Sequence, residues 1–208
     1  MMMNYLMRTS VLFTFCVLLF SCASSDEDAY ISLKRKPFDK IITYEQSLGS
    51  VQLDGVFHGK APSNFFPGRD SFDLDRSLMF LRQGDEVPLK TVYYFTPDST
   101  IELILYEWNV VQPGMSLAQA DSATRGLDKE WNRYEALFYS IAEEVGKQYG
   151  AVTLGDGKTV KEDSKLWDLW KKEVSWELQD KTIELKLVWM PKIGFRHHKI
   201  LLKVYGFK

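Results

Sequence analysis

Cysteine is almost missing from this sequence, which has two among its 208 residues, Cys16 and Cys22. From residue 23 onward the chain has no thiol, so its folded part can form no disulfide bond and must be held by its hydrophobic core. The same lack excludes cysteine catalysis and thiolate metal sites in that part of the chain.

Histidine is scarce too, with three residues, and no metal-binding pattern includes them. His197 and His198 are neighbours, and neighbouring side chains on a strand point to opposite faces. We therefore interpret them as polar residues at the start of a strand. His58 precedes the acidic segment 70–75, which lacks the central glycine of a calcium-binding loop. We predict no metal and no cofactor.

Neither charge nor hydropathy favours a nucleic acid or a membrane-spanning domain. The chain has 26 basic and 28 acidic residues, without the excess of lysine and arginine that nucleic-acid binding needs. Its one terminal apolar run, Val11 to Phe20, is ten residues long, is interrupted by Thr14 and follows Arg8. This length lies within the range of about 7–15 residues of a secretory signal peptide. A short buried helix or strand is the alternative interpretation.

The residues after this run, Leu19-Phe20-Ser21-Cys22, resemble the lipobox of bacterial lipoproteins. The resemblance implies that residues 1–21 are a signal peptide and are removed. It also implies that Cys22 carries a diacylglyceryl group on its sulfur and usually an acyl group on its new amino terminus. Such multiple chains give stable anchoring. The acidic segment 23–28 is similar to the export tail of Bacteroidota surface lipoproteins, so we expect residues 22–36 to form a lipidated tether at the outer membrane.

Residues 37–208 are predicted to form one α+β domain. Alternating apolar residues predict strands over 51–57, 174–178, 183–189 and 200–204. Strands are also predicted over 77–82, over 90–95, which is rich in Val and Tyr, and over the long apolar run 100–109, with a loop over 58–76. Between the two groups, Ser116 and Gln119 fit a capping box, and apolar positions from Leu127 to Tyr149 recur at steps of three and four. We expect one long amphipathic helix packed on one face of an antiparallel sheet, with the other face wet.

The six tryptophans all lie between Trp108 and Trp189. Trp167 and Trp170 stand in a segment without a clear period, and they are the candidate pair for an exposed surface that stacks on a ligand such as a sugar ring. The alternative is that the tryptophans fill a core that has no disulfides. The loop tip Phe65-Phe66-Pro67 could insert into a partner, or fold back onto the sheet.

No catalytic motif is present. The chain has no nucleophile elbow, Walker loop or dinucleotide fingerprint, and we interpret the glutamates of the predicted strands as cross-strand ion pairs. The sequence therefore favours a non-enzymatic lipoprotein of the cell envelope that binds a protein or a glycan. A structural component of an envelope complex and a hydrolytic enzyme are the alternatives.

Overall fold

The computed structural model describes residues 38–53, 59–62, 71–74, 76–83, 87–125, 130–163, 168–189 and 198–206. The chain divides into two units, Met1–Ser32 and Leu33–Lys208, and every described residue lies in the second. The predicted signal peptide (1–21), Cys22, the tether, Trp167, His197, His58 and Phe65-Phe66-Pro67 lie outside the described residues.

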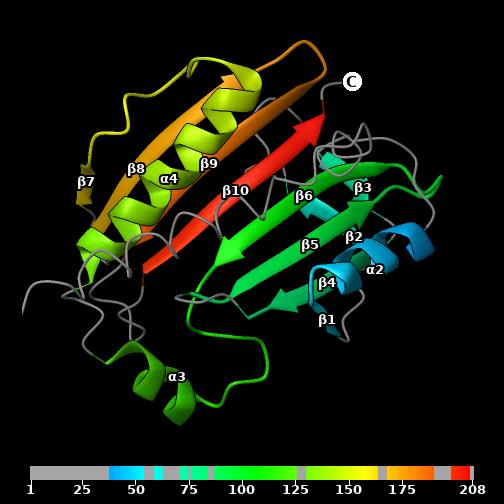
Figure 1. Ribbon diagram of the computed structural model, residues 1–208, viewed down its shortest axis with the longest axis horizontal. Helices are drawn as coiled ribbons and strands as arrows, with labels where there is room; N and C mark the ends of the chain where they lie inside the picture. Colours follow the sequence, from blue (N-terminus) through cyan, green and yellow to red (C-terminus); the bar gives the residue numbers. More distant parts are fainter. Residues whose placement is uncertain are drawn as a thin grey trace, which may run out of the picture. The chain divides into compact units, whose positions relative to one another are not determined.

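The described elements are three helices and ten strands (Figure 1). The helices are α2 (Phe38–Ser47), α3 (Leu117–Thr124) and α4 (Trp131–Tyr149). The strands are β1 (Val51–Leu53), β2 (Gly59–Pro62), β3 (Ser71–Leu74), β4 (Arg76–Arg82), β5 (Leu89–Phe95), β6 (Ile101–Trp108), β7 (Val160–Asp163), β8 (Asp168–Glu177), β9 (Lys181–Trp189) and β10 (His198–Gly206).

Eight strands form one antiparallel sheet in the order β1-β4-β5-β6-β10-β9-β8-β7, and β2 pairs with β3 in a separate hairpin. Strands before the helical region meet strands after it where β6 pairs with β10. The prediction of an antiparallel sheet built from both parts of the chain is confirmed. This pairing joins the strands that precede α3 and α4 in sequence to the strands that follow them.

One row of apolar residues crosses five strands and forms the centre of the core. Cross-strand registers join Tyr93, Ile104, Val204, Ile183 and Trp176 in that order. Each of these side chains is at most 1% exposed. Residues in register share a face of the sheet, so this row marks the face that must be covered.

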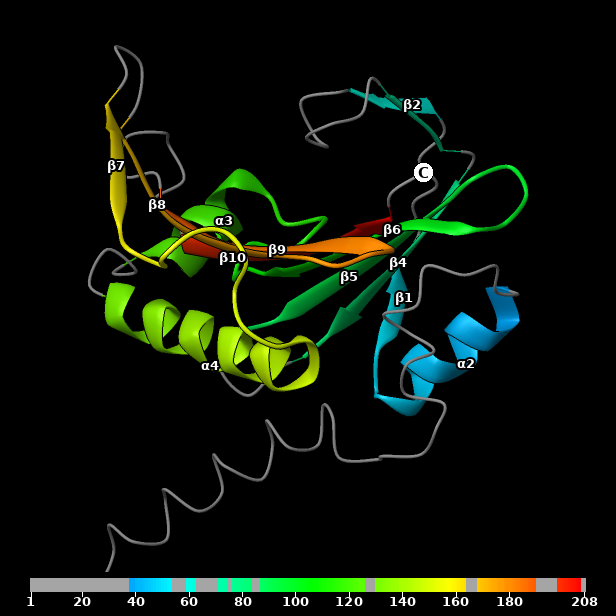
Figure 2. The same ribbon diagram turned by 90° about the horizontal axis from the view of Figure 1, so that it is seen from above.

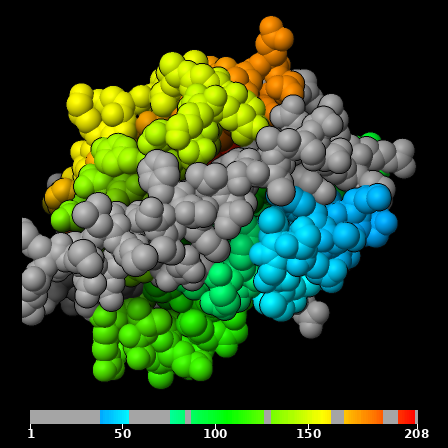
Figure 3. All heavy atoms as spheres, in the orientation of Figure 1, coloured from blue at the N-terminus to red at the C-terminus, as the bar shows by residue number. Residues whose placement is uncertain are grey.

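Helices α2 and α4 both lie on this face (Figures 1 and 2). Phe38 of α2 meets Phe95 of β5 edge to face with ring centroids 4.6 Å apart. Tyr134 and Phe138 of α4 are fully buried. The outer sides of α4 and α2 form part of the molecular surface, as the space-filling view shows (Figure 3). The α4 helix ends where Trp176 donates a hydrogen bond from Nε1 to the carbonyl oxygen of Gly150, 3.1 Å away.

The prediction of a single long helix is wrong. Two helices of 8 and 19 residues, α3 and α4, occupy the region instead. The capping box that Ser116 forms with Gln119 is present and belongs to the short α3. The apolar period of the sequence did not show that α3 ends at Thr124 and that α4 begins at Trp131.

Three further differences from the sequence predictions concern the first part of the chain and the second face of the sheet. Residues 38–47, for which the sequence analysis predicts no helix or strand, form helix α2. The predicted loop over 58–76 contains β2 and β3, whose glycine, proline and aspartate content hides a strand signal. The face opposite the helices is also not uniformly wet, since Thr182 and Glu184 are only 6% exposed.

No described helix is both long enough and apolar enough to span a membrane.

Candidate functional site

Three of the five described tryptophans gather with two other rings at one end of the helix-covered face. The aromatic cluster, as we define it, consists of Trp131 and Tyr134 of α4, Trp170 of β8, Trp189 of β9 and His198 of β10. Of the other two described tryptophans, Trp176 is fully buried in the core and Trp108 lies on β6.

Strand register brings the sheet members of the aromatic cluster together. Trp170 is the register partner of Trp189, and Trp189 is the register partner of His198, so the three side chains share one face on adjacent strands. Trp131 and Tyr134 are three positions apart in the first turn of α4, and this spacing places both on the same side of the helix. The first turn of α4 therefore packs two more rings against the strand residues.

The imidazole of His198 is at the centre of the aromatic cluster. It stacks between Tyr134, at a centroid distance of 5.0 Å and an angle of 25°, and Trp189, at 5.3 Å and 14°. Trp131 lies 5.6 Å from His198 and 6.2 Å from Trp189, and Trp170 lies 6.1 Å from Trp189. Each such ring pair contributes about 0.5–1.5 kcal/mol beyond its buried area, so the rings fix each other's positions.

Burial separates the aromatic cluster into an inner and an outer part. Tyr134 and His198 are fully buried, whereas Trp131, Trp170 and Trp189 each keep part of their surface in solvent. Burial raises the pKa of Tyr134 to about 12, against a lowering by the charge of the neighbouring Arg133, so its phenol stays neutral. The inner rings thus form a rigid support for three accessible indoles.

Two buried polar atoms of the aromatic cluster have no hydrogen-bond partner within the described part of the chain. They are the hydroxyl oxygen of Tyr134 and the indole Nε1 of Trp189. A buried polar group without a partner costs about 1–3 kcal/mol, so native proteins keep few of them. Both atoms are buried, so they belong to the packing of the cluster and not to its accessible surface.

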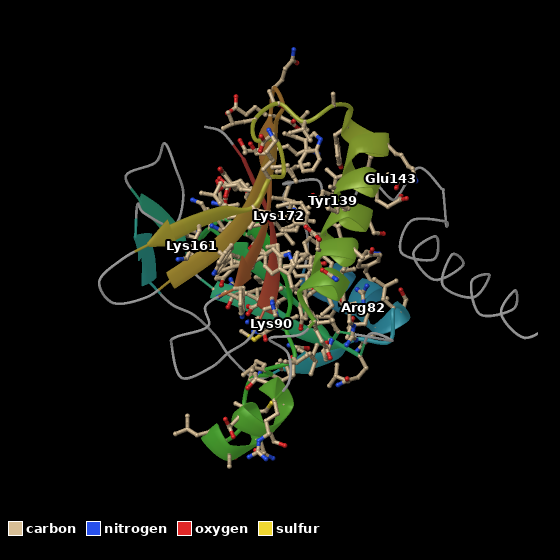
Figure 4. The ribbon with its side chains drawn as sticks, turned by 90° about the vertical axis from the view of Figure 1, so that its left-hand side faces the viewer. Arg82, Lys90, Tyr139, Glu143, Lys161 and Lys172 are labelled. Atoms are coloured by element: carbon tan, nitrogen blue, oxygen red, sulfur yellow. The ribbon has the colours of Figure 1, made fainter. Side chains whose placement is uncertain are left out.

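Charged groups border the aromatic cluster, and each of them is engaged. Lys161 of β7 lies over the ring of Trp170 with its Nζ 5.7 Å from the centroid. Lys172, one same-face step from Trp170 on β8, is 5% exposed and places its Nζ 2.6 Å from Oε1 of Glu135. Figure 4 shows Lys172 directed toward Tyr139 of α4, whose hydroxyl is 2.8 Å from Nζ.

The carboxylates on the opposite face of the sheet form ion pairs with lysines. Glu173 lies 2.7 Å from Lys186, and Glu184 lies 3.4 Å from the same Nζ and 3.9 Å from Lys203. Glu184 also accepts a hydrogen bond of 2.7 Å from the hydroxyl of Tyr205. Burial lowers the pKa of Lys203, although the charge of Glu184 opposes this shift. These contacts are those of a cross-strand charge network.

Of the two tryptophans that the sequence indicates as a ligand-stacking pair, one lies among the described residues. Trp170 keeps part of its surface in solvent and lies in the cluster, but its predicted partner Trp167 lies outside the described residues. His198 begins a strand as predicted, yet it is fully buried between rings. Sequence reasoning missed Trp189 as the neighbour of Trp170, and Trp131 as the neighbour of Trp189. Pairing the two predicted C-terminal strands as a hairpin would have placed Trp189 beside His198.

No protein-family model matches this sequence, and no curated protein or solved structure is detectably similar to it. The geometry of the site is therefore the basis of any functional argument. Among the residues that the structure describes, no group of three or more histidine, cysteine, aspartate and glutamate side chains is placed to hold a metal ion.

Proposed function

We propose that this protein is a lipid-anchored, non-enzymatic binding module of the bacterial envelope whose aromatic cluster binds a glycan. The observation that carries the proposal is the convergence of three part-exposed indoles from α4, β8 and β9. Indole faces and sugar rings both present flat, weakly hydrated surfaces, so stacking between them is favourable. Of the two ligand classes that the sequence favours, protein and glycan, this arrangement supports the glycan.

Binding is tested on the full-length protein in detergent micelles by calorimetric titration with neutral hexasaccharides of different linkage. We expect saturable binding of at least one of them, and a loss of about tenfold or more in affinity for Trp170→Ala, equivalent to about 1.4 kcal/mol. Trp108→Phe changes an indole outside the cluster and should bind like the wild type. Equal affinities of Trp170→Ala and the wild type, or no binding by the wild type, would overturn the proposal.

The membrane anchor is a separate part of the proposal and rests on Leu19-Phe20-Ser21-Cys22 and on the apolar run before it. We expect the mature protein to begin at Cys22, to carry acyl chains there and to lie in the outer membrane. Mass spectrometry of the protein from its native envelope measures this directly. An unmodified Cys22 thiol or a retained residue 1–21 segment would contradict it.

A further inference from the structure

The polar border of the aromatic cluster indicates which kind of glycan fits it. We infer that Glu135 is the specificity-determining residue of the site and that it selects a neutral, hydroxyl-rich saccharide over an acidic one. This inference rests on the proposed glycan-binding function and concerns the same site. It assigns a role to a carboxylate that is paired on only one of its two oxygens.

Glu135 is placed next to the accessible indoles from both sides. It stands one turn after Trp131 on α4, so the two side chains lie on the same stripe of the helix. Its ion pair with Lys172 joins it to β8, where Lys172 is two residues from Trp170 on the same face. The carboxylate of Glu135 therefore lies between Trp131 of the helix and Trp170 of the strand.

One carboxylate oxygen of Glu135 is available to a ligand. Oε1 contacts the ammonium group of Lys172 at 2.6 Å, and the side chain remains 30% exposed. Within the described residues, this ion pair is the one polar interaction of Glu135, which leaves Oε2 as an acceptor. A sugar hydroxyl can donate to Oε2, and hydrogen bonds to a charged acceptor are about twice as strong as neutral ones.

The cations around the aromatic cluster offer little to an acidic sugar. Lys172 is neutralised by Glu135, and Arg133 is 2.9 Å from Glu130. Lys161 lies over the Trp170 ring and has a further interaction of its own. A uronate or sulfate would instead approach the part-exposed carboxylate of Glu135, and two like charges close together repel. The border therefore favours a neutral ligand.

The test compares a neutral hexasaccharide that the wild type binds with a hexagalacturonate of equal length, using the full-length protein in micelles. Glu135→Gln is nearly isosteric, removes the negative charge and leaves the charge of Lys172 uncompensated. We expect its affinity for the neutral sugar to fall about tenfold and its affinity for the hexagalacturonate to rise, whereas a merely structural loss would weaken both. Glu143→Gln, which changes an exposed carboxylate of the same helix (Figure 4), serves as the control and should bind like the wild type.

The outcomes separate this inference from the proposed function. If Trp170→Ala loses binding while Glu135→Gln keeps both wild-type affinities, the site binds glycans but Glu135 does not determine their class, and the inference is wrong. Stronger binding of the hexagalacturonate than of every neutral sugar by the wild type would also overturn it. If the wild type binds no saccharide of either kind, both proposals fail together.

Discussion

Replacing Glu45 by leucine should destabilise the protein strongly, because the buried carboxylate of Glu45 holds α2 against the sheet through hydrogen bonds to both of its oxygens. The side chain is 1% exposed. Oε1 accepts a hydrogen bond of 2.7 Å from the hydroxyl of Tyr93, and Oε2 accepts one of 2.6 Å from Ser50 and one of 3.1 Å from Arg82. Leucine has a similar volume and fills the space, so the change isolates the polar contacts.

The expected loss follows from the groups that Glu45→Leu leaves behind. Removing one partner of a buried ion pair costs about 3–5 kcal/mol, because the remaining charge is uncompensated. Arg82 is 14% exposed in its side chain, so partial hydration holds the loss toward the lower end of this range. In a domain of this size, a change of 1 kcal/mol shifts the melting temperature by about 2–4 °C, so we expect a decrease of about 6–12 °C.

Urea unfolding followed by tryptophan fluorescence and thermal melting followed by circular dichroism measure this loss. Glu143→Gln changes an exposed carboxylate and should melt like the wild type. The double variant Glu45→Leu/Arg82→Met removes the stranded charge and should recover part of the stability. A Glu45→Leu variant as stable as the wild type would refute the view that this buried network holds α2 in place.

Three further substitutions test other parts of the structure. Gly155 has a φ of +88°, and a Cβ at this position would overlap the carbonyl oxygen of Glu173, so Gly155→Ala should cost about 1–3 kcal/mol in urea unfolding. Burial alone would raise the pKa of Glu107, but Lys90 at 2.5 Å outweighs it and the pKa lies below its usual 4.5. The resulting stabilisation is present above pH 4.5 and is lost as the pH falls through the lower folded pKa, so the stability difference between the wild type and Glu107→Gln should shrink on acidification. Tyr134→Phe removes an unpartnered buried hydroxyl, so its melting temperature should equal or exceed that of the wild type.

Much of the sheet could be predicted from the sequence. Strands β9 and β10 alternate apolar and polar residues, because one side of each packs under the helices, and the observed bounds of β5, β9 and β10 lie close to those predicted. The short strands β2 and β3 could not be found in this way, since their glycine, proline and aspartate residues are typical of loops. Local composition describes a loop and a short hairpin equally well.

The candidate site depended on information that the sequence does not display. The sequence indicates Trp170, but the cluster members Trp131, Trp189 and His198 are spread over more than sixty positions of the chain. The order of strands β10, β9 and β8 brings the strand residues together and the packing of α4 adds Trp131, and neither is encoded in the period of any one segment. For the same reason, the pairing of Glu135 with Lys172 between α4 and β8 could not be foreseen.

The indole N–H signals of the ¹⁵N-labelled full-length protein in micelles test the central claim most directly. The six tryptophans give six such signals, which single substitutions assign. On titration with the bound neutral hexasaccharide, the signals of Trp131, Trp170 and Trp189 should shift together with one dissociation constant, and that of the buried Trp176 should stay in place. Saturable binding that leaves these three signals unchanged would contradict the account.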